Sequence, residues 1–121
     1  MSSSSESADV VICGGGALGS SVAYHLAADP GFRGRVIVVE KDPTYRYAAS
    51  ALSAASIRQQ YSSAVNIRIS LHGIDFLRNI GAHLAVDGEA PVIDLHEGGY
   101  LYLAGEEGAP VLAANQALQA T

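Results

Sequence analysis

Two short apolar runs near the beginning of the chain flank a segment with helical spacing. The runs ADVVIC (8–13) and RVIVVE (35–40) are rich in β-branched residues, which is typical of strands buried on both faces. Between them, the segment 17–29 is rich in helix formers, with apolar side chains four apart from Leu18 onward. A strand, a helix and a strand within about thirty residues predict a right-handed βαβ unit with parallel strands.

The pattern changes after the second apolar run. Residues 41–50 are loop-like, and residues 51–63 are dominated by small side chains. Apolar residues then recur at intervals of three and four over about residues 63–85, which predicts a long amphipathic helix. Two β-like runs on either side of Gly98 and Gly99, in VIDLHEGGYLYLAG, predict a β-hairpin. The closing stretch APVLAANQALQAT is helical in composition.

Together these elements predict an α/β fold. We expect a Rossmann-like βαβ dinucleotide-binding unit, followed by a long helix and a β-hairpin. A complete doubly wound domain has further βα units, whereas this pattern contains two parallel strands. The chain is therefore expected to be the N-terminal piece of a larger protein. Residues 1–7 are serine-rich and are expected to be a disordered N-terminus.

Composition and charge narrow the class of protein. Of the 121 residues, 49% are hydrophobic and 16% are charged, as in a globular domain. Seven basic against twelve acidic side chains give a net charge of −5, and no local run of Lys or Arg offsets it, so no nucleic-acid partner is expected. The apolar runs are too short for a membrane span, and the first residues do not resemble a secretory signal, so we expect a cytoplasmic protein.

Cysteine and histidine do not indicate a metal site. Cys13 is the only cysteine, so no disulfide can form within the chain. The four histidines are not spaced to form a metal site with it. Because Cys13 closes an apolar strand, we expect it to behave as a small buried hydrophobe.

Three glycines between the first predicted strand and the first predicted helix carry the main functional signal. Gly14, Gly16 and Gly19 match G-x-G-x-x-G. In that motif the first glycine permits a tight turn, the second lets a pyrophosphate approach the backbone, and the third allows close helix–strand packing. The pyrophosphate then lies at the helix N-terminus, which favours negative charge. The candidate residues of this loop are Gly14, Gly15, Gly16, Ala17, Leu18 and Gly19.

An acidic residue ends the second predicted strand. Glu40 lies 21 residues after Gly19, where a carboxylate accepts hydrogen bonds from the ribose of an adenosine. A carboxylate there repels a 2′-phosphate, which disfavours NADP. The alternative is a purely structural turn with a solvated Glu40, but that leaves three consecutive glycines unexplained. The fingerprint itself does not choose between FAD and NAD.

Longer stretches of the sequence resemble the D-amino-acid oxidase and sarcosine oxidase superfamily of FAD-dependent oxidoreductases. The resemblance is carried by VVICGGGALGSSVAYHLA, by the strand end VIVVEK with Glu40 and Lys41, and above all by AASALSAASIRQQYS. It continues through NIRISLHGIDFLRNI and GGYLYLA and so covers nearly the whole chain from residue 8.

The resemblance implies a two-domain flavoprotein about three times as long. Residues 8–88 would form the first stretch of an incomplete FAD-binding domain, and residues 89–121 would begin a substrate domain that is truncated here. Such enzymes oxidise a C–N bond of a small-molecule amine or amino acid by passing hydride to the flavin. Their catalytic residues come mostly from other parts of the chain, so we name none here, and the sequence does not indicate an oligomeric state.

The resemblance also implies further cofactor-binding residues. Arg58 matches an arginine near the flavin that steadies an anionic flavin or a substrate carboxylate, although it could equally be an ordinary surface arginine. No histidine occurs between His25 and His72, so the implied FAD is non-covalent. In the family, a segment of small residues passes the pyrophosphate and the flavin. That segment is matched by Ser50, Ala51, Ser53 and Ala54, which could instead form an ordinary helix turn.

Two other interpretations remain open at this point. One is a free-standing NAD-binding regulatory module, although the long helix and hairpin do not supply the further βα units it needs. The other is a truncated, inactive fragment of the flavoprotein. A separate feature is the pair Tyr100 and Tyr102, which lie two apart on a predicted strand. Their side chains could line a cavity or pack against neighbouring strands.

Overall fold

A computed structural model of the protein describes residues 7–120, which form two compact units that divide between Ser56 and Ile57. The expectation of a disordered N-terminus falls on residues that, apart from Ser7, lie outside the described part. The domain boundary expected after residue 88 stays a prediction. Within residues 7–120, every helix is too short or too polar to cross a membrane.

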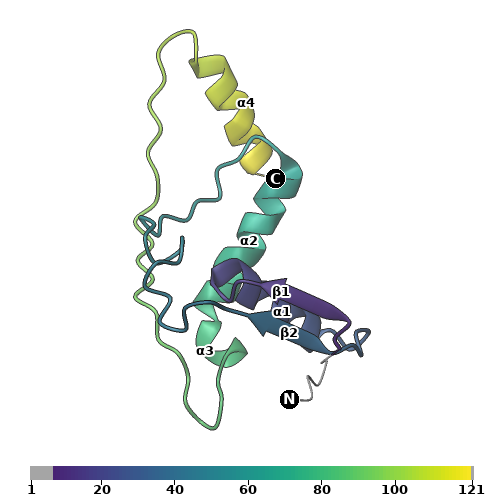
Figure 1. The fold of residues 1–121 in the computed structure, drawn as a ribbon. Helices are drawn as coiled ribbons and strands as arrows, with labels where there is room; N and C mark the ends of the chain where they lie inside the picture. Colours follow the sequence, from purple (N-terminus) through teal and green to yellow (C-terminus); the bar gives the residue numbers. More distant parts are fainter. Residues whose placement is uncertain (1–6, 121) are drawn as a thin grey trace, which may run out of the picture. The chain divides into compact units, whose positions relative to one another are not determined.

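The first unit contains a parallel βαβ arrangement, as predicted. Strand β1 (Val10–Cys13) pairs in parallel with β2 (Val36–Val39), and α1 (Ala17–Ala28) connects them and contacts both (Figure 1). The register aligns the strands residue for residue from Val10 with Val36 to Cys13 with Val39. The carboxyl ends of both strands therefore finish at the same edge of the sheet.

The expectation that both strands are buried on both faces is wrong for the described unit. Along β1, half-buried and exposed side chains alternate, and Val11 keeps 57% of its surface exposed. Successive side chains on a strand point to opposite faces, and within residues 7–56 only α1 packs against the two strands. The pattern is therefore that of a sheet covered on one face. Cys13, expected to be buried, is exposed as well.

Hydrogen bonds join the neighbouring chain segments at both ends of β1 and β2, and the one at the carboxyl end involves the glycine loop. At the amino end, Asp9 N donates to Arg35 O at 3.0 Å, and Arg35 N donates to the Asp9 carboxylate at 2.7 Å. At the carboxyl end, Gly14 N donates to Val39 O at 2.8 Å. The ladder thus continues one residue into the glycine loop, which places Glu40 beside that loop.

The second unit is built on the amphipathic helix that the spacing predicts, but the helix is interrupted. One residue, Asn79, separates α2 (Ala64–Arg78) from α3 (Ile80–His83). At the junction, Asn79 has φ −105° and its side-chain amide donates to Asp75 O at 2.9 Å. Asn79 also keeps the helical bond from its own N to Asp75 O at 3.1 Å, but its φ −105° and ψ 17° leave the helical conformation, so the single helix expected over 63–85 is divided in two. Among the described residues, Ile67 and Ile74 of α2 are the buried hydrophobic side chains.

A second helix packs near the start of α2. Helix α4 (Ala109–Gln119) forms where the composition indicated a helix, with Pro110 in its first turn. Its C-terminal end lies beside the beginning of α2 (Figure 1). The side-chain amide of Gln119 donates to Tyr61 O at 2.9 Å, which ties α4 to the segment that leads into α2.

The predicted β-hairpin is absent from the described chain. Residues 90–105 contain no strand and run as an extended connection between α3 and α4 (Figure 1). Gly99 has φ +73°, a conformation suited to a turn, but the two apolar runs do not pair. An isolated two-stranded hairpin is marginal in water, and no further strand of this unit supports it. As a result Leu101 and Leu103 are almost fully exposed.

Candidate cofactor site

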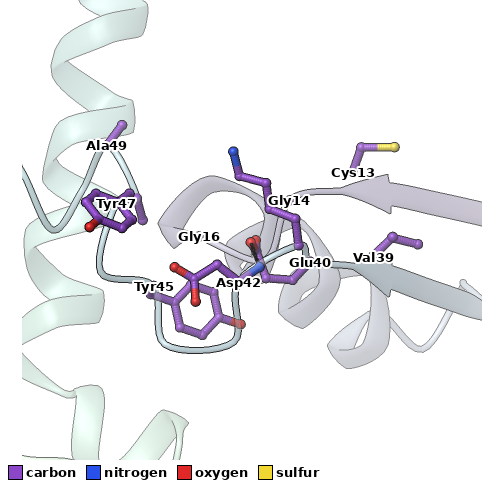
Figure 2. A pocket seen from close by; sticks show the side chains of 11 residues that line it. Cys13, Gly14, Gly16, Val39, Glu40, Asp42, Tyr45, Tyr47 and Ala49 are labelled. Carbon is purple, nitrogen blue, oxygen red and sulfur yellow. Dashed lines mark hydrogen bonds between the residues drawn. The ribbon is translucent and has the colours of Figure 1, made fainter.

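A cavity of about 730 Å³ lies at the carboxyl ends of β1 and β2 (Figure 2). Its volume is in the range of small-molecule and cofactor sites. Four of the residues expected from the sequence line it, namely Gly14, Gly16, Glu40 and Lys41. The sequence did not indicate its other lining residues, which are Cys13, Val39, Asp42, Tyr45, Tyr47, Ala48 and Ala49.

Two of the motif glycines are required by the chain itself. Gly14 has φ +100°, a backbone conformation that side-chain-bearing residues rarely adopt, so it makes the turn out of β1. At Gly19 a Cβ would lie 1.8 Å from the Gly14 carbonyl oxygen and 3.1 Å from a methyl of Ile12. Helix α1 therefore approaches β1 more closely than any side chain at position 19 allows.

The middle glycine of the motif has no such requirement. Gly16 is the N-cap of α1, and a Cβ there would meet only Ala48 Cβ, at 4.0 Å. Among the described residues, no side chain caps the N-terminus of α1, and the first turn of α1 carries no acidic group. There is therefore room beside Gly16 at the positive end of the helix dipole, and the first turn adds no competing carboxylate, which fits a diphosphate. Ala17 and Leu18 form the first turn, and Leu18 is exposed.

Glu40 braces the glycine loop. One carboxylate oxygen accepts from Gly15 N at 2.7 Å, and the other accepts from Asp42 N at 2.9 Å. These backbone donors, Asp42 first and then Gly15, hold the pKa of Glu40 below its ordinary value of 4.5. A carboxylate has about four lone-pair sites, so both oxygens can still accept a further hydrogen bond, as from a ribose hydroxyl. The bracing contact was not foreseen from the sequence.

The loop after β2 folds back onto the glycine loop through its own hydrogen bonds. The Asp42 carboxylate accepts from the Thr44 hydroxyl at 2.6 Å and from Thr44 N at 3.0 Å, and these bonds lower the pKa of Asp42. Tyr45 N donates to Asp42 O at 3.0 Å, which closes a turn. Tyr45 follows with φ +55° and places its hydroxyl against Gly15.

The small-residue segment is not part of this cavity. Ser50, Ala51, Ser53 and Ala54 are exposed. Residues 49–52 form a turn in which Leu52 N donates to Ala48 O at 3.1 Å, as in one turn of a helix, and no longer helix forms here. The Ser53 hydroxyl donates to Ser50 O at 2.8 Å and accepts from Ala55 N at 3.2 Å. The hydrogen bonds of this segment are thus local, and its role beside a cofactor stays a prediction.

Arg58 belongs to the second unit and is held by two tyrosines. Its guanidinium donates to the Tyr102 hydroxyl at 3.0 Å, and its Cζ lies 5.1 Å from the centre of the Tyr61 ring. The hydrogen bond to Tyr102 is the main cause that raises the pKa of Arg58, and no carboxylate among residues 7–120 contributes. The rings of Tyr100 and Tyr102 stack with centroids 6.5 Å apart. Arg58 is therefore oriented while its charge is left unneutralised.

The described residues provide no cluster of three or more His, Cys, Asp or Glu side chains that could hold a metal ion. His83 is used in packing, because its ring stacks on Phe76 with centroids 4.6 Å apart. The open face at Gly16, the helix dipole and Glu40 instead suit the adenosine diphosphate part of a dinucleotide.

Comparison with known proteins agrees with this assignment. A family model described as FAD dependent oxidoreductase, abbreviated DAO, matches residues 9–121. The chain is 50% identical over 117 residues to FAD-dependent oxidoreductase domain-containing protein 1 of Xenopus laevis, and 47% identical over 117 residues to the Bos taurus protein of that name. A homologue in Drosophila melanogaster is 42% identical over 111 residues.

These matches cover most of this chain but little of each relative. They include 94% of the chain for the Xenopus and Bos proteins and 92% for the Drosophila protein. The chain spans only 23%, 24% and 21% of those relatives, respectively. No solved structure matches the chain significantly.

Proposed function

The chain belongs to the DAO family of FAD-dependent oxidoreductases, and on this premise we propose that its first unit holds the adenosine diphosphate half of FAD at the glycine loop. The observation that carries the proposal is the contrast among the glycines. Gly14 and Gly19 are needed for the turn and for helix packing, whereas a Cβ on Gly16, at the N-terminus of α1, would meet only Ala48 Cβ, at 4.0 Å. A glycine that the fold does not need is explained by a ligand that approaches it closely.

Charge supports the same ligand. A diphosphate at the N-terminus of α1 meets backbone N–H groups and the positive end of the helix dipole. Lys41, which lines the cavity, adds a cationic side chain. The site thus attracts the anionic middle of a dinucleotide from its glycine side.

Glu40 accounts for the sugar side of the site. Its pKa is lowered by the backbone donors that it accepts, so it is ionised at neutral pH. An ionised carboxylate accepts hydrogen bonds from ribose hydroxyls and repels a 2′-phosphate. The residues therefore suit FAD, held without a covalent bond, better than NADP.

The family indicates the type of reaction, an FAD-dependent oxidation, but it does not identify the substrate. Bound FAD would accept a hydride, and we take the substrate to be an amine or amino acid, whose carbon next to nitrogen would give up the hydride while its nitrogen loses a proton and the C–N single bond becomes C=N. Arg58, oriented by Tyr61 and Tyr102 and not neutralised by a carboxylate, suits the carboxylate of an amino acid. The chain covers about a quarter of its curated relatives, so the activity of the whole protein is part of this proposal. Its cytoplasmic location stays a prediction.

Direct titration tests the proposal. The 121-residue chain is titrated with FAD and, separately, with NAD, and binding is followed by flavin fluorescence or calorimetry. We expect saturable FAD binding that Gly16→Val abolishes, because the valine side chain enters the space assigned to the diphosphate. Gly73→Ala is a control outside the cavity, since Gly73 lies in α2 and no atom stands within 4 Å of the place a Cβ would take there. NAD binding without FAD binding, or FAD binding that Gly16→Val leaves intact, contradicts the proposal.

A further inference from the structure

Tyr45 is one of the cavity residues that the family assignment leaves without a role. We propose that Tyr45 is a cofactor-binding residue whose phenolic hydroxyl donates a hydrogen bond to the diphosphate held by the glycine loop. The inference rests on the proposed function, because it names a further contact of the same site.

The position of the hydroxyl carries the argument. A Cβ placed on Gly15 would lie 2.8 Å from Tyr45 Oη, so the hydroxyl reaches the glycine loop from thirty residues further along the chain. The Tyr45 ring lines the same cavity as Gly14 and Gly16, near Asp42 and Glu40 (Figure 2). The residue is 41% exposed, so a ligand in the cavity can reach it.

The hydroxyl is also an unused donor. No group among residues 7–120 forms a hydrogen bond with Tyr45 Oη, and the side chain takes part in no ring stack or ion pair there. Its neighbour Gly15, by contrast, has its N–H engaged by the Glu40 carboxylate at 2.7 Å. The Gly15 N–H is therefore engaged within the protein, whereas the Tyr45 hydroxyl beside it is available to a ligand.

The backbone holds Tyr45 in this place at a cost. A φ of +55° is a left-handed conformation that a bulky residue rarely adopts. Tyr45 N donates to Asp42 O, and Ala48 N donates to Tyr45 O, each at 3.0 Å. The Asp42–Thr44 hydrogen bonds stiffen the same turn. A strained residue in a lined cavity points to a ligand contact, because strain of this kind gathers at such sites.

The chemistry matches a diphosphate. Its oxygens are anionic acceptors, and hydrogen bonds from O–H groups to anionic oxygens are among the shorter and stronger ones in proteins. A phenol supplies one such donor without adding positive charge. The Tyr45 hydroxyl is therefore matched to the diphosphate, and adenosine, which lacks phosphate, is the ligand that checks this assignment against the ribose.

The test compares Tyr45→Phe with the unchanged chain, using ADP, adenosine and FAD as ligands. The variant removes only the hydroxyl, and circular dichroism checks that the fold is kept. We expect about tenfold weaker binding of ADP and FAD, as for the loss of one hydrogen bond to a charged group at an accessible site, and unchanged binding of adenosine. Tyr100→Phe is the control, since Tyr100 belongs to the second unit and is not among the residues that line the cavity, and it should leave ADP binding unchanged.

A second measurement uses the unchanged chain with tyrosine labelled at ¹³Cζ. The Tyr45 resonance, assigned by its loss in Tyr45→Phe, should shift on adding ADP and stay in place on adding adenosine. Equal ADP affinity of the unchanged chain and Tyr45→Phe overturns the role of Tyr45 while leaving the proposed function standing. A parallel loss of adenosine binding overturns it too, because the ring and not the hydroxyl would then be the contact. If the unchanged chain binds neither ADP nor FAD, both proposals fail.

Discussion

The carbonyl oxygen of Gly14 fills the space above Gly19, because a Cβ on Gly19 would lie 1.8 Å from it. The obstructing atom belongs to the backbone of the turn, and Ile12 closes the other side at 3.1 Å. Gly19→Ala must therefore push α1 away from β1. We expect it to destabilise the first unit by about 1–3 kcal/mol, as overpacking does, in urea unfolding followed by NMR of its amides.

The control for this prediction is Gly73→Ala. Gly73 lies in α2, and no atom stands within 4 Å of the place that an alanine methyl would take there. Alanine is also the better helix former by about 0.5–1 kcal/mol. The same glycine-to-alanine change should thus stabilise one unit and destabilise the other. Equal effects at both positions would show that the contact between Gly14 and Gly19 is unimportant.

Replacing Glu40 by glutamine should loosen the glycine loop. The carboxylate accepts from two backbone donors, Gly15 N and Asp42 N, one on each oxygen. A glutamine amide has one acceptor and one donor group, so it can satisfy only one of these N–H groups. We expect faster hydrogen exchange of the Gly15 or Asp42 amide and weaker FAD binding. Exchange rates that match those of the unchanged chain would contradict the bracing role.

Lowering the pH should break the hydrogen bonds between the Glu40 carboxylate and the glycine loop. Because the folded-state pKa of Glu40 lies below 4.5, its contribution to stability is fully present above pH 4.5. That contribution is lost as the pH falls through the lowered folded-state value. An NMR pH titration of the Gly15 amide should therefore show its transition below pH 4.5, and Glu40→Gln should remove that transition. A midpoint above pH 4.5 would mean that the hydrogen bonds do not favour the carboxylate.

The Tyr102 hydroxyl should restrict the motion of Arg58. It accepts the Arg58 hydrogen bond at 3.0 Å, while Tyr61 lies under the guanidinium. Tyr102→Phe removes that acceptor and keeps the ring, so we expect a lower order parameter for the Arg58 Nε–H group in ¹⁵N relaxation. Tyr100→Phe is the control, because the contact of Tyr100 with this cluster is made by its backbone carbonyl and its ring. An unchanged order parameter in Tyr102→Phe would contradict the prediction.

The βαβ unit was predictable because its signals are local. Apolar runs, helical spacing and glycines all lie within the first forty residues, and the parallel pairing confirms them. The hairpin around Gly99 was not, because strands form only when partners are present, and residues 90–105 have none in the described chain. The break at Asn79 lies in the backbone dihedrals of one residue, φ −105° and ψ 17°, which spacing does not reveal.

The candidate site also contains residues that the sequence predicts and residues that it does not. The glycines and Glu40 were found from sequence because their spacing follows directly from the strand, loop and helix between them. Tyr45 and Asp42 were missed because their place depends on a turn with a positive φ, and no periodicity encodes such a turn. The one sequence signal was the cluster of tyrosines immediately after the second strand, at Tyr45 and Tyr47.

The two-stranded sheet has a consequence for hydrogen exchange. In a parallel pair, successive residues of a strand direct their backbone groups to opposite sides, and within the described chain β1 and β2 each have a partner on one side only. Amide protection should therefore alternate along both strands, with every second N–H exchanging rapidly. A further strand laid against either outer edge would protect the exposed amides of that strand. Exchange along Val10–Cys13 and Val36–Val39 would thus show which edge of the sheet accepts another strand.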